Sequence, residues 1–503
     1  MIFSFLFCFF IRSASGAANF ECPINPITAE SGPIGVIPSN RVGLSVIPAK
    51  YDCAYHFLIY PGWALHFSIS THYDQLLGDN ITFTDNLGVV RLLPTPNQHI
   101  DEWSSAPTAI LHIRTLSNTS QMFAIYEFVN VEKKYQQVII PTGEYLALEN
   151  MKNRYFTFSS KANDRVALNI AVKNTQDYDT LLEFMFVYDG GDVRNCQMVG
   201  RLSNFLRNKK ISTSSNVTIL NFYDGKSPSY LIANDWSSEK PLLFKSREIR
   251  AFAEVSVFSK YKAILTSKNQ QTTGELFDAS DQGAAYTWIC SDCNNFYWTV
   301  LKFHKSTTTV PKAYIELRSL SPTHNTSTLL NYSVSATLDR NFPQLIPSRM
   351  FTMINHYSGI AVTLDTSTSQ AMTQRWLRPY DGRRGTIFSP SIWDPKTPPT
   401  FSFQFEDDNQ KFMFGVNVKE VRIAAAGESL TIKTGPTASD NFSYKEFVSD
   451  STDFWTRRES KGNFMQIAYD GLDRRSMAIV SFDMKQINSG TRDDPLYTIF
   501  VSI

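Results

Sequence analysis

The tripeptide Tyr-Asp-Gly occurs four times in this chain, usually after an apolar run, and this repetition strongly constrains the fold. The four segments are LLEFMFVYDG (181–190), NFYDG (221–225), RPYDG (378–382) and IAYDG (467–471). Aspartate accepts local backbone hydrogen bonds, and glycine adopts positive φ without steric cost, so the pair is typical of turns. The tyrosine ring is expected to pack while its hydroxyl stays near water. We therefore predict strand exits, with a loop as the alternative for RPYDG, the least strand-like segment.

Alternation of large apolar residues with smaller or polar ones predicts the strands themselves. WALHFSIS (63–70) has this period of two, as expected for a half-buried strand, and it follows HFLIY and a Pro-Gly turn. QQVII-PTG-EYLAL (136–148) repeats the arrangement about 80 residues later. The chain is also rich in Phe (37) and Tyr (22), which fit a pleated sheet surface. Helical periodicity is rare, with RLSNFLRNKK (201–210) as a candidate short helix, so we predict an all-β protein.

The length of 503 residues is too great for one hydrophobic core, which predicts several domains. Polar and Pro-containing junctions suggest divisions near residues 133, 241 and 343. The predicted β-modules are therefore 18–132, 133–240, 241–342 and 343–503. A hydrophobic content of 43% and a charged content of 19% argue against disorder or coiled coil for most of the chain. The net charge of +1 gives no support to a polyanion-binding protein as a whole, although local patches remain possible.

The first residues predict secretion. Residues 2–11 (IFSFLFCFFI) are apolar without a break, and small residues follow at 13–18, as in a secretory signal peptide. We predict a signal peptide at 1–17, with a buried N-terminal strand or a short membrane anchor as alternatives. The run is too short to span a bilayer, and no later segment reaches 18 apolar residues, so we expect no transmembrane span. The predicted location is extracellular.

Several of these segments resemble CUB domains, which are extracellular β-sandwiches. The segments are YDCAYHFLIYPGWALHFSIS (51–70), IIPTGEYLALE (139–149) and LLEFMFVYDG (181–190). The order Cys22, then Cys53-Ala54-Tyr55-His56-Phe57, then Pro61-Gly62-Trp63 is similar to the divergent CUB-like secreted proteins of nematodes. The resemblance is strongest over about 20–235 and implies tandem CUB-like jelly-roll or β-sandwich modules. It also implies a non-catalytic binding role in innate immunity or stress response at an epithelial surface, with possible peripheral association with membrane microdomains.

Cysteines and glycosylation signals agree with the predicted compartment. In a secreted chain we expect Cys22 to pair with Cys53, tying the N-terminal segment to the first strand pair. Cys290 and Cys293 form a CxxC between strand-like segments, which favours a local disulfide loop over redox chemistry, and a buried free thiol is expected at Cys196. Predicted N-glycosylation sites are Asn80, Asn118, Asn216, Asn325, Asn331 and Asn441.

Metal binding and catalysis have weak sequence support. Some CUB domains bind calcium near the Asp-Gly turn, and the acidic candidates here are Asp177, Asp179, Glu183, Asp189 and Asp192. Solvated turn carboxylates are the favoured alternative, so we predict no bound metal and no cofactor. The motifs HExxH, GxSxG and GxxxxGK[ST] are absent, and His66 and His72 are expected at the surface. We predict that the protein is not an enzyme.

One basic patch is a candidate site for an anionic ligand. It consists of Arg375, Trp376, Arg378, Arg383 and Arg384. Arginine binds sulfate, phosphate and carboxylate bidentately, so a glycan or a membrane surface would be the ligand; a solvated loop is the alternative. The predicted partner is an extracellular protein or glycan, and no nucleic acid. A self-associating matrix protein is the second candidate function, and an enzyme of unrecognised type is the third.

Overall fold

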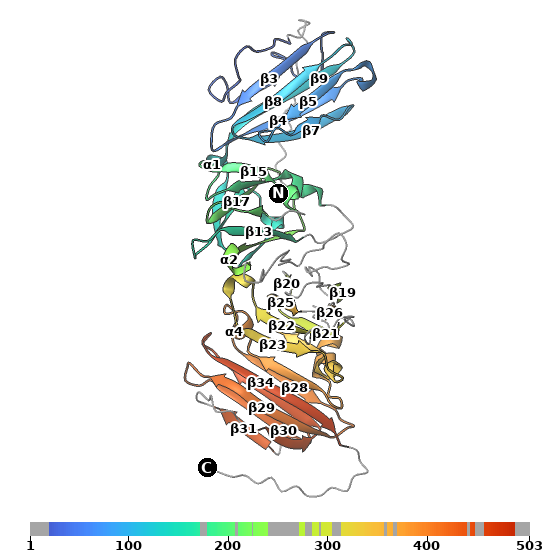
Figure 1. The fold of residues 1–503 in the computed structure, drawn as a ribbon, viewed down its shortest axis with the longest axis vertical. Helices are drawn as coiled ribbons and strands as arrows, with labels where there is room; N and C mark the ends of the chain where they lie inside the picture. The colour runs from blue at the N-terminus through green and yellow to red at the C-terminus, as the bar shows by residue number, and fades with distance from the viewer. Residues whose placement is uncertain are drawn as a thin grey trace.

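The chain forms a row of β-sandwiches. The structure is a computed structural model that describes residues 20–171, 179–206, 210–223, 225–239, 271–276, 284–290, 293–303, 313–356, 360–365, 370–439, 443–447 and 457–487. The predicted signal peptide at 1–17 lies outside these residues. The described strands form eight sheets, and each sheet packs on one partner. Figure 1 shows the four sandwiches one after another along the long axis of the molecule, from the first in blue to the fourth in red.

The first and second sandwiches contain the strands between residues 34 and 235. The first packs β1-β9-β4-β7, with β2 beside β9, on β3-β8-β5-β6. Its strands are β1 (Ile34–Ile37), β2 (Ser45–Val46), β3 (Asp52–Leu58), β4 (Trp63–His72), β5 (Asn80–Thr84), β6 (Val90–Leu92), β7 (Asn97–Ser105), β8 (Thr108–Arg114) and β9 (Gln121–Asn130). The second packs β10-β12-β17-β14-β15 on β11-β18-β13-β16. Its strands are β10 (Gln136–Pro141), β11 (Tyr145–Ala147), β12 (Arg154–Ser159), β13 (Val166–Ala171), β14 (Met185–Asp189), β15 (Gln197–Arg201), β16 (Lys210–Ile211), β17 (Asn216–Asn221) and β18 (Tyr230–Asp235).

The third and fourth sandwiches follow the same plan. The third packs β19-β26-β21-β24 on β20-β25-β22-β23. Its strands are β19 (Gln271–Leu276), β20 (Ala284–Ile289), β21 (Phe296–Phe303), β22 (Tyr314–Ser319), β23 (Thr328–Ser333), β24 (Gln344–Ile346), β25 (Met350–His356) and β26 (Ile360–Asp365). The fourth packs β27-β34-β29-β32 on β28-β33-β30-β31. Its strands are β27 (Arg384–Phe388), β28 (Phe401–Glu406), β29 (Phe412–Arg422), β30 (Ser429–Gly435), β31 (Ser443–Phe447), β32 (Arg458–Gly462), β33 (Phe464–Asp470) and β34 (Met477–Gln486).

Short helices lie between the strands. The α-helices are α1 (Val131–Lys134), α2 (Trp236–Glu239), α3 (Gln370–Leu377) and α4 (Pro390–Trp393). The described 3-10 turns are η1 (Gln75–Leu77), η2 (Leu148–Asn150), η3 (Thr180–Phe184), η4 (Leu202–Phe205), η6 (Pro322–His324) and η7 (Leu338–Asn341). Within the predicted helix at 201–210, the described turn is only η4. Nearly all strand pairs are antiparallel, β10 with β12 being parallel.

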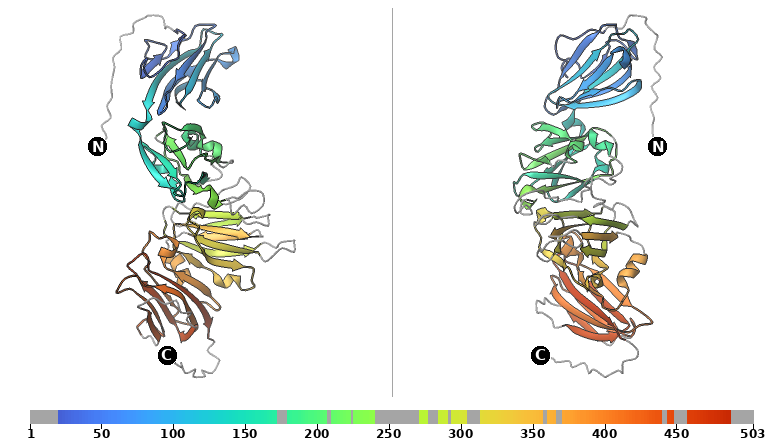
Figure 2. Two further views of the ribbon diagram at one scale, coloured as in Figure 1. Left: turned by 60° about the vertical axis from the view of Figure 1, so that its left-hand side comes forward. Right: turned by 45° about the vertical axis from the view of Figure 1, so that its right-hand side comes forward.

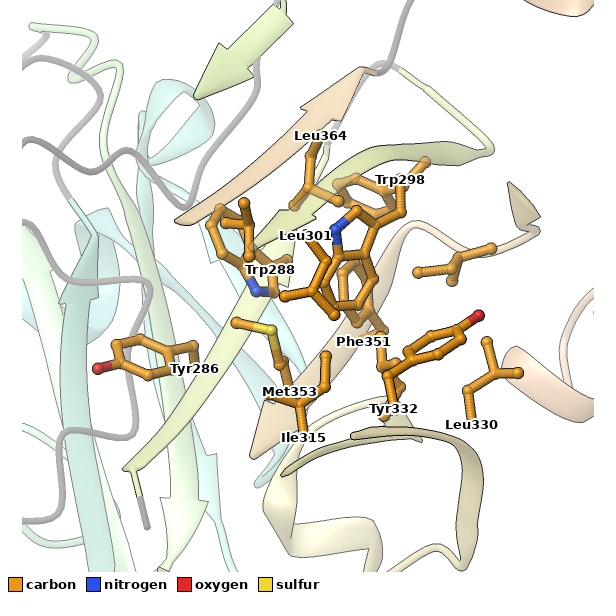
Figure 3. Close-up of a cluster of buried hydrophobic side chains, with 14 of the residues drawn as sticks. Tyr286, Trp288, Trp298, Leu301, Ile315, Leu330, Tyr332, Phe351, Met353 and Leu364 are labelled. Carbon is orange, nitrogen blue, oxygen red and sulfur yellow. The ribbon is translucent and has the colours of Figure 1, made fainter. Parts of the chain in front are cut away.

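Each core is built from the inward positions of alternating strands. In the first sandwich, Leu65, Phe67 and Ile69 of WALHFSIS are fully buried, as the period of two predicts. In the third, Trp288, Trp298 and Phe351 from both sheets meet in one cluster, shown in Figure 3. The all-β prediction is therefore confirmed, and the sheets pair as sandwiches.

One predicted division of the chain differs from the strand pairing. The sequence places residue 343 at the start of the last module, but β24, β25 and β26 lie after it and pair with strands that precede it. The fourth sandwich begins at β27. The Pro-containing segment LDRNFPQLIP looked like a linker, yet Phe342 and Ile346 are buried in the core of the third sandwich. The other predicted boundaries remain predictions.

Two Tyr-Asp-Gly segments, 181–190 and 467–471, end strands as predicted, and NFYDG begins at the last residue of β17. β14 ends at Asp189 and β33 at Asp470, whereas RPYDG is a turn with Gly382 at φ +76°. The hydroxyls do not stay near water: Tyr188 hydrogen-bonds to Ser105 (2.9 Å), and Tyr223 donates to the Asp101 carbonyl (2.8 Å). Both partners belong to the first sandwich. The Tyr-Asp-Gly tyrosines of the second sandwich therefore join it to the first.

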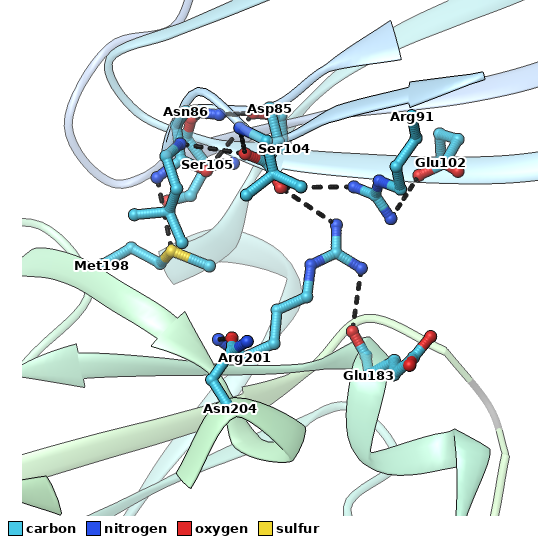
Figure 4. Close-up of polar contacts among 12 residues, drawn as sticks. Asp85, Asn86, Arg91, Glu102, Ser104, Ser105, Glu183, Met198, Arg201 and Asn204 are labelled. Atoms are coloured by element: carbon cyan, nitrogen blue, oxygen red, sulfur yellow. Dashed lines mark hydrogen bonds and ion pairs between the residues drawn. The ribbon is translucent and has the colours of Figure 1, made fainter. Parts of the chain in front are cut away.

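Packing and buried charges complete this first joint. The ring of Trp103 is stacked on Phe222 of the second sandwich, with centroids 4.6 Å apart and planes at 5°. Arg201 of the second sandwich reaches Asp85 of the first (3.4 Å) and donates to the Glu183 carbonyl (2.9 Å), as Figure 4 shows. A joint with paired buried charges and stacked rings holds the two sandwiches in one fixed orientation.

Candidate binding groove

The two disulfides of the structure are those expected from the sequence. Cys22 bonds to Cys53 at the start of β3, with Cα atoms 5.7 Å apart, and Cys290 bonds to Cys293 beside the core of the third sandwich. Cys196 is a free, half-buried thiol. Burial raises the pKa of this thiol, which disfavours the reactive thiolate.

The described acidic candidates for calcium are not brought together around one point. Asp179 accepts hydrogen bonds from the hydroxyls of Ser227 and Ser229, both at 2.5 Å. Asp189 accepts from the backbone of Thr213, and Asp192 caps its own turn. Among the residues described, no three His, Cys, Asp or Glu side chains form a group suited to a metal ion. Asp177 lies outside the described residues.

The predicted arginine patch divides into buried and exposed members. Arg383 and Trp376 are almost completely buried in the fourth sandwich, so neither can contact a ligand at the surface. The Arg383 guanidinium donates to the carbonyls of Trp376 and Arg378 and lies over the rings of Trp376 (5.0 Å) and Phe405 (5.1 Å). Burial lowers the pKa of Arg383 to about 10. The assignment of Arg383 to an anion site is wrong, because its guanidinium is buried against backbone carbonyls and aromatic rings of the core.

The exposed members, Arg375, Arg378 and Arg384, lie in different surroundings. Arg375 is on α3 and Arg378 follows that helix, whereas Arg384 begins the edge strand β27. Arg384 lines a groove of about 550 Å³ between the third and fourth sandwiches, and neither of the other two does. Figure 2 shows these two sandwiches directly adjacent in both views.

The floor of the groove is the outward face of the sheet β27-β34-β29-β32. One row across the sheet joins Thr386, Ser481 and Asn417, which are in register. The next row joins Arg384 and Asp483, with Gly415 beyond. Because side chains alternate along a strand, the inward neighbours, including Phe482 and Val480, fill the core beneath.

The wall of the groove comes from the third sandwich. It consists of the edge strand β23, with Asn331 and Ser333 exposed, and the loop that carries Ser335, Thr337 and Asn341. The buried Gln344 fixes wall to floor, because its amide donates to the Thr386 carbonyl (2.6 Å) and accepts from the Thr386 backbone N–H (3.1 Å). The wall and the floor are thus held together by two hydrogen bonds between the Gln344 side chain and the Thr386 backbone.

The charged side chains of the groove differ in whether they are paired. Arg457 pairs with Asp483 (2.7 Å) and with Glu459 (2.9 Å), both partly exposed. A side chain on Gly415 would collide with this ion pair, since its Cβ would lie 2.6 Å from an Asp483 oxygen. Within the described part of the chain Arg384 has no ion-pair partner, and the Asp483 carboxylate across from it pairs with Arg457. The described lining therefore carries two cations, one anion and otherwise amide, hydroxyl and a few apolar groups.

Sequence reasoning found Arg384 but missed the other groove residues. Asn417, Arg457, Ser481 and Asp483 lie far from Arg384 in the chain, and no motif marks them. For Asn417, Ser481 and Asp483 the signal is a polar position in a strand whose alternate residues are apolar, and Arg457 lies before β32 without such a signal. Strand order, which the sequence does not provide, brings them together.

The predicted glycosylation sites differ in access. Asn118, Asn325 and Asn331 are exposed, and Asn331 lines the groove. Asn80 and Asn216 are half-buried, and the Asn216 amide donates to Ser215 (3.2 Å). Asn441 lies outside the described residues. Glycosylation at each site stays a prediction.

Comparison with known proteins gives one family match. The model of the CUB-like domain matches residues 17–132, and no curated protein matches. Solved structures with similarity include the CUB1-EGF-CUB2 domain of human MASP-1/3, at 11% identity over 40% of this chain and 100% of that one, with a TM-score of 0.17. The rat MASP-1 domains match at 9% identity over 68% of this chain and 98% of that one, with a TM-score of 0.19.

A further match comes from the triple jelly-roll fold and turret assembly of an archaeal virus. It has 9% identity over 64% of this chain and 82% of that one, with a TM-score of 0.17. TM-scores this low carry no argument about the present chain. The helices that the structure describes include none with the length and apolar character needed to span a membrane. The matched segment coincides with the first sandwich and its disulfide, and residues 17–132 are a CUB-like domain of the nematode type.

Proposed function

We propose that this protein is a secreted, non-catalytic binding protein that recognises an extracellular glycan or protein. The observation that carries the proposal is the polar groove between the third and fourth sandwiches, which is concave, partly charged and fixed by hydrogen bonds. The CUB-like domain, the disulfides and the predicted signal peptide support an extracellular setting. By its resemblance to the CUB-like group, the protein acts in innate immunity or stress response at an epithelial surface.

The chemistry of the groove supports binding over catalysis. Hydrolysis of a sugar chain generally requires two carboxyl groups on either side of the bond. The described lining contains one, Asp483, and this carboxylate is paired with Arg457 at 2.7 Å. It contains no histidine or cysteine that could serve as a base or nucleophile.

Self-association as a matrix component is the second candidate function. It is favoured by the edge strand β6 of the first sandwich, on which Val90 is 63% exposed and Leu92 is 50% exposed. Exposed apolar edges promote pairing between chains. Sedimentation of the secreted protein separates the two functions, because a matrix component would form concentration-dependent oligomers and a binding protein would not require them.

The test begins with expression of the chain, with its own leader, in a secreting animal cell. Mass spectrometry of the medium should find cleavage near residue 17, glycans on exposed sequons and oxidised Cys22–Cys53. The recovered protein should then retain ligands from arrays of glycans and extracellular proteins. A chain that remains inside the cell with a reduced Cys22, or one that binds nothing on the arrays, would contradict the proposal.

A further inference from the structure

We infer that the groove binds an anionic oligosaccharide, a sugar chain that carries carboxylate or sulfate groups, with Arg384 as its anchor. The inference rests on the proposed binding function and assigns to it a site and a ligand class. It is carried by three features of the groove: an arginine without an ion-pair partner among the described residues, rows of groups that suit sugar hydroxyls, and walls that are already fixed.

The first feature is Arg384 itself. It begins an edge strand, is exposed, and projects from the face of the sheet that forms the groove floor. Arg457, in contrast, is held by Asp483 and Glu459. A guanidinium group presents a planar fork of donors that matches a carboxylate or a sulfate. Asp483, opposite Arg384 in the sheet, pairs with Arg457 instead, and no described acidic residue forms an ion pair with Arg384. An external anion is therefore its natural partner.

The second feature is the set of amide and hydroxyl groups beside it. Thr386, Ser481 and Asn417 form a row across the floor, and Asn331 and Thr337 face them from the wall. The Asn417 amide has no hydrogen bond within the described part of the chain. Most sites for drug-like molecules are predominantly apolar with few polar groups, whereas this lining is predominantly polar. Such a surface suits a ligand with many hydroxyl groups.

The third feature is the fixed geometry of the groove. Gln344 bonds to both backbone groups of Thr386, and the Tyr380 hydroxyl donates to the Phe342 carbonyl (2.5 Å), so two sets of hydrogen bonds join the third and fourth sandwiches. The groove therefore exists before the ligand arrives. Binding to a preformed site avoids the entropy cost of ordering it.

Asn331 provides a complication that the test must address. It lies on the wall and is a predicted glycosylation site, so a glycan on its amide would stand at the groove. The Asn331→Gln variant removes that glycan and keeps an amide on the wall. It therefore separates the binding of an external sugar chain from occupancy by the protein's own glycan.

The experiment measures binding of labelled oligosaccharides to the full secreted protein by fluorescence polarisation. The probes are a sulfated heparin-type oligosaccharide, a carboxylated hyaluronan oligosaccharide and neutral dextran. The variants are Arg384→Gln and the matched control Arg378→Gln, which removes another exposed arginine, outside the groove, each with and without Asn331→Gln. Thermal unfolding should be unchanged in both arginine variants, because neither side chain is buried.

We expect at least one anionic probe to bind and dextran not to bind. Arg384→Gln should weaken anionic binding by about tenfold or more, and Arg378→Gln should leave it within about twofold. The sulfated and carboxylated probes then identify which anionic group is preferred. The inference would be overturned if Arg384→Gln and Arg378→Gln bound the anionic probes equally well, or if dextran bound as well as the anionic probes. If array ligands bind independently of Arg384, the proposed function stands and this site assignment fails; if nothing binds at all, both fail.

Discussion

Replacing Arg383 by methionine tests whether this arginine stabilises the fourth sandwich or binds a ligand. The side chain is fully buried, and its guanidinium donates to the carbonyls of Trp376 and Arg378. Removing the donors leaves these acceptors unsatisfied, at a cost of about 1–3 kcal/mol each. Relief from burying a charge without a carboxylate partner offsets part of this cost. We expect Arg383→Met to lower the free energy of unfolding of the fourth sandwich by about 2–4 kcal/mol.

The assay must resolve one sandwich, since a chain with several domains does not unfold in two states. Hydrogen exchange followed by mass spectrometry does so, by comparing peptides from β27, β29 and β34 with those of the first sandwich. The expected change accelerates exchange in the fourth sandwich by about 30- to 700-fold and leaves the first unchanged. Arg378→Met is the control, because Arg378 is exposed. Unchanged exchange in Arg383→Met, together with loss of anion binding, would refute the structural role.

Three further predictions concern the first sandwich and its joint. Burial disfavours ionisation of Asp79, but hydrogen bonds from serine hydroxyls and backbone amides outweigh it and lower the pKa of Asp79 from 3.8 to about 2. The stabilisation of the folded state by the Asp79 carboxylate is therefore complete above pH 3.8 and lost as the pH falls towards 2. The Asp79→Asn variant should be less stable at pH 7. Its free energy of unfolding, followed by fluorescence, should also fall less steeply as the pH is lowered. Trp103→Ala removes the stack on Phe222 and should cost about 3–5 kcal/mol, with faster proteolysis between the first two sandwiches; equal cleavage rates would contradict this. Cys22→Ser opens a loop closed over 31 residues of separation and should cost the first sandwich about 3.5–4 kcal/mol, while added reductant should no longer affect its melting temperature.

The sequence predicted the strands because their physics is local. Alternation places Leu65, Phe67 and Ile69 on one face regardless of what covers them, and Asp-Gly ends a strand wherever the chain must turn. The boundary at residue 343 failed because composition alone cannot distinguish a linker from a buried irregular segment. Phe342 belongs to the core, and the polar residues around it face the groove or the next sandwich.

The prediction of one arginine patch was wrong, and the alternation of side chains along an extended segment explains why. Arg383 and Arg384 are adjacent in sequence, but successive side chains of an extended segment point to opposite faces. Arg383 therefore enters the core while Arg384 reaches the groove. A cluster in sequence becomes a cluster in space only along every second residue of a strand. Applied to RRGTIF (383–388), this rule separates the two arginines, although it does not show which one is buried.

The Tyr-Asp-Gly segments and the groove follow from one arrangement. A turn at the end of a sandwich lies where the neighbouring sandwich begins, so a tyrosine hydroxyl there can reach it. Tyr188 and Tyr223, at or after the ends of strands, bond to the first sandwich, and Tyr380, in the turn before β27, bonds to the third. Tyr469 is the exception, since it donates to the Arg422 carbonyl within its own sandwich (2.8 Å). Where such bonds join two sandwiches, the surface between them is fixed and can hold a ligand without further ordering. Loss of the Tyr380 hydroxyl should therefore weaken ligand binding in the groove although that hydroxyl is not part of its lining, because it would loosen the wall against the floor.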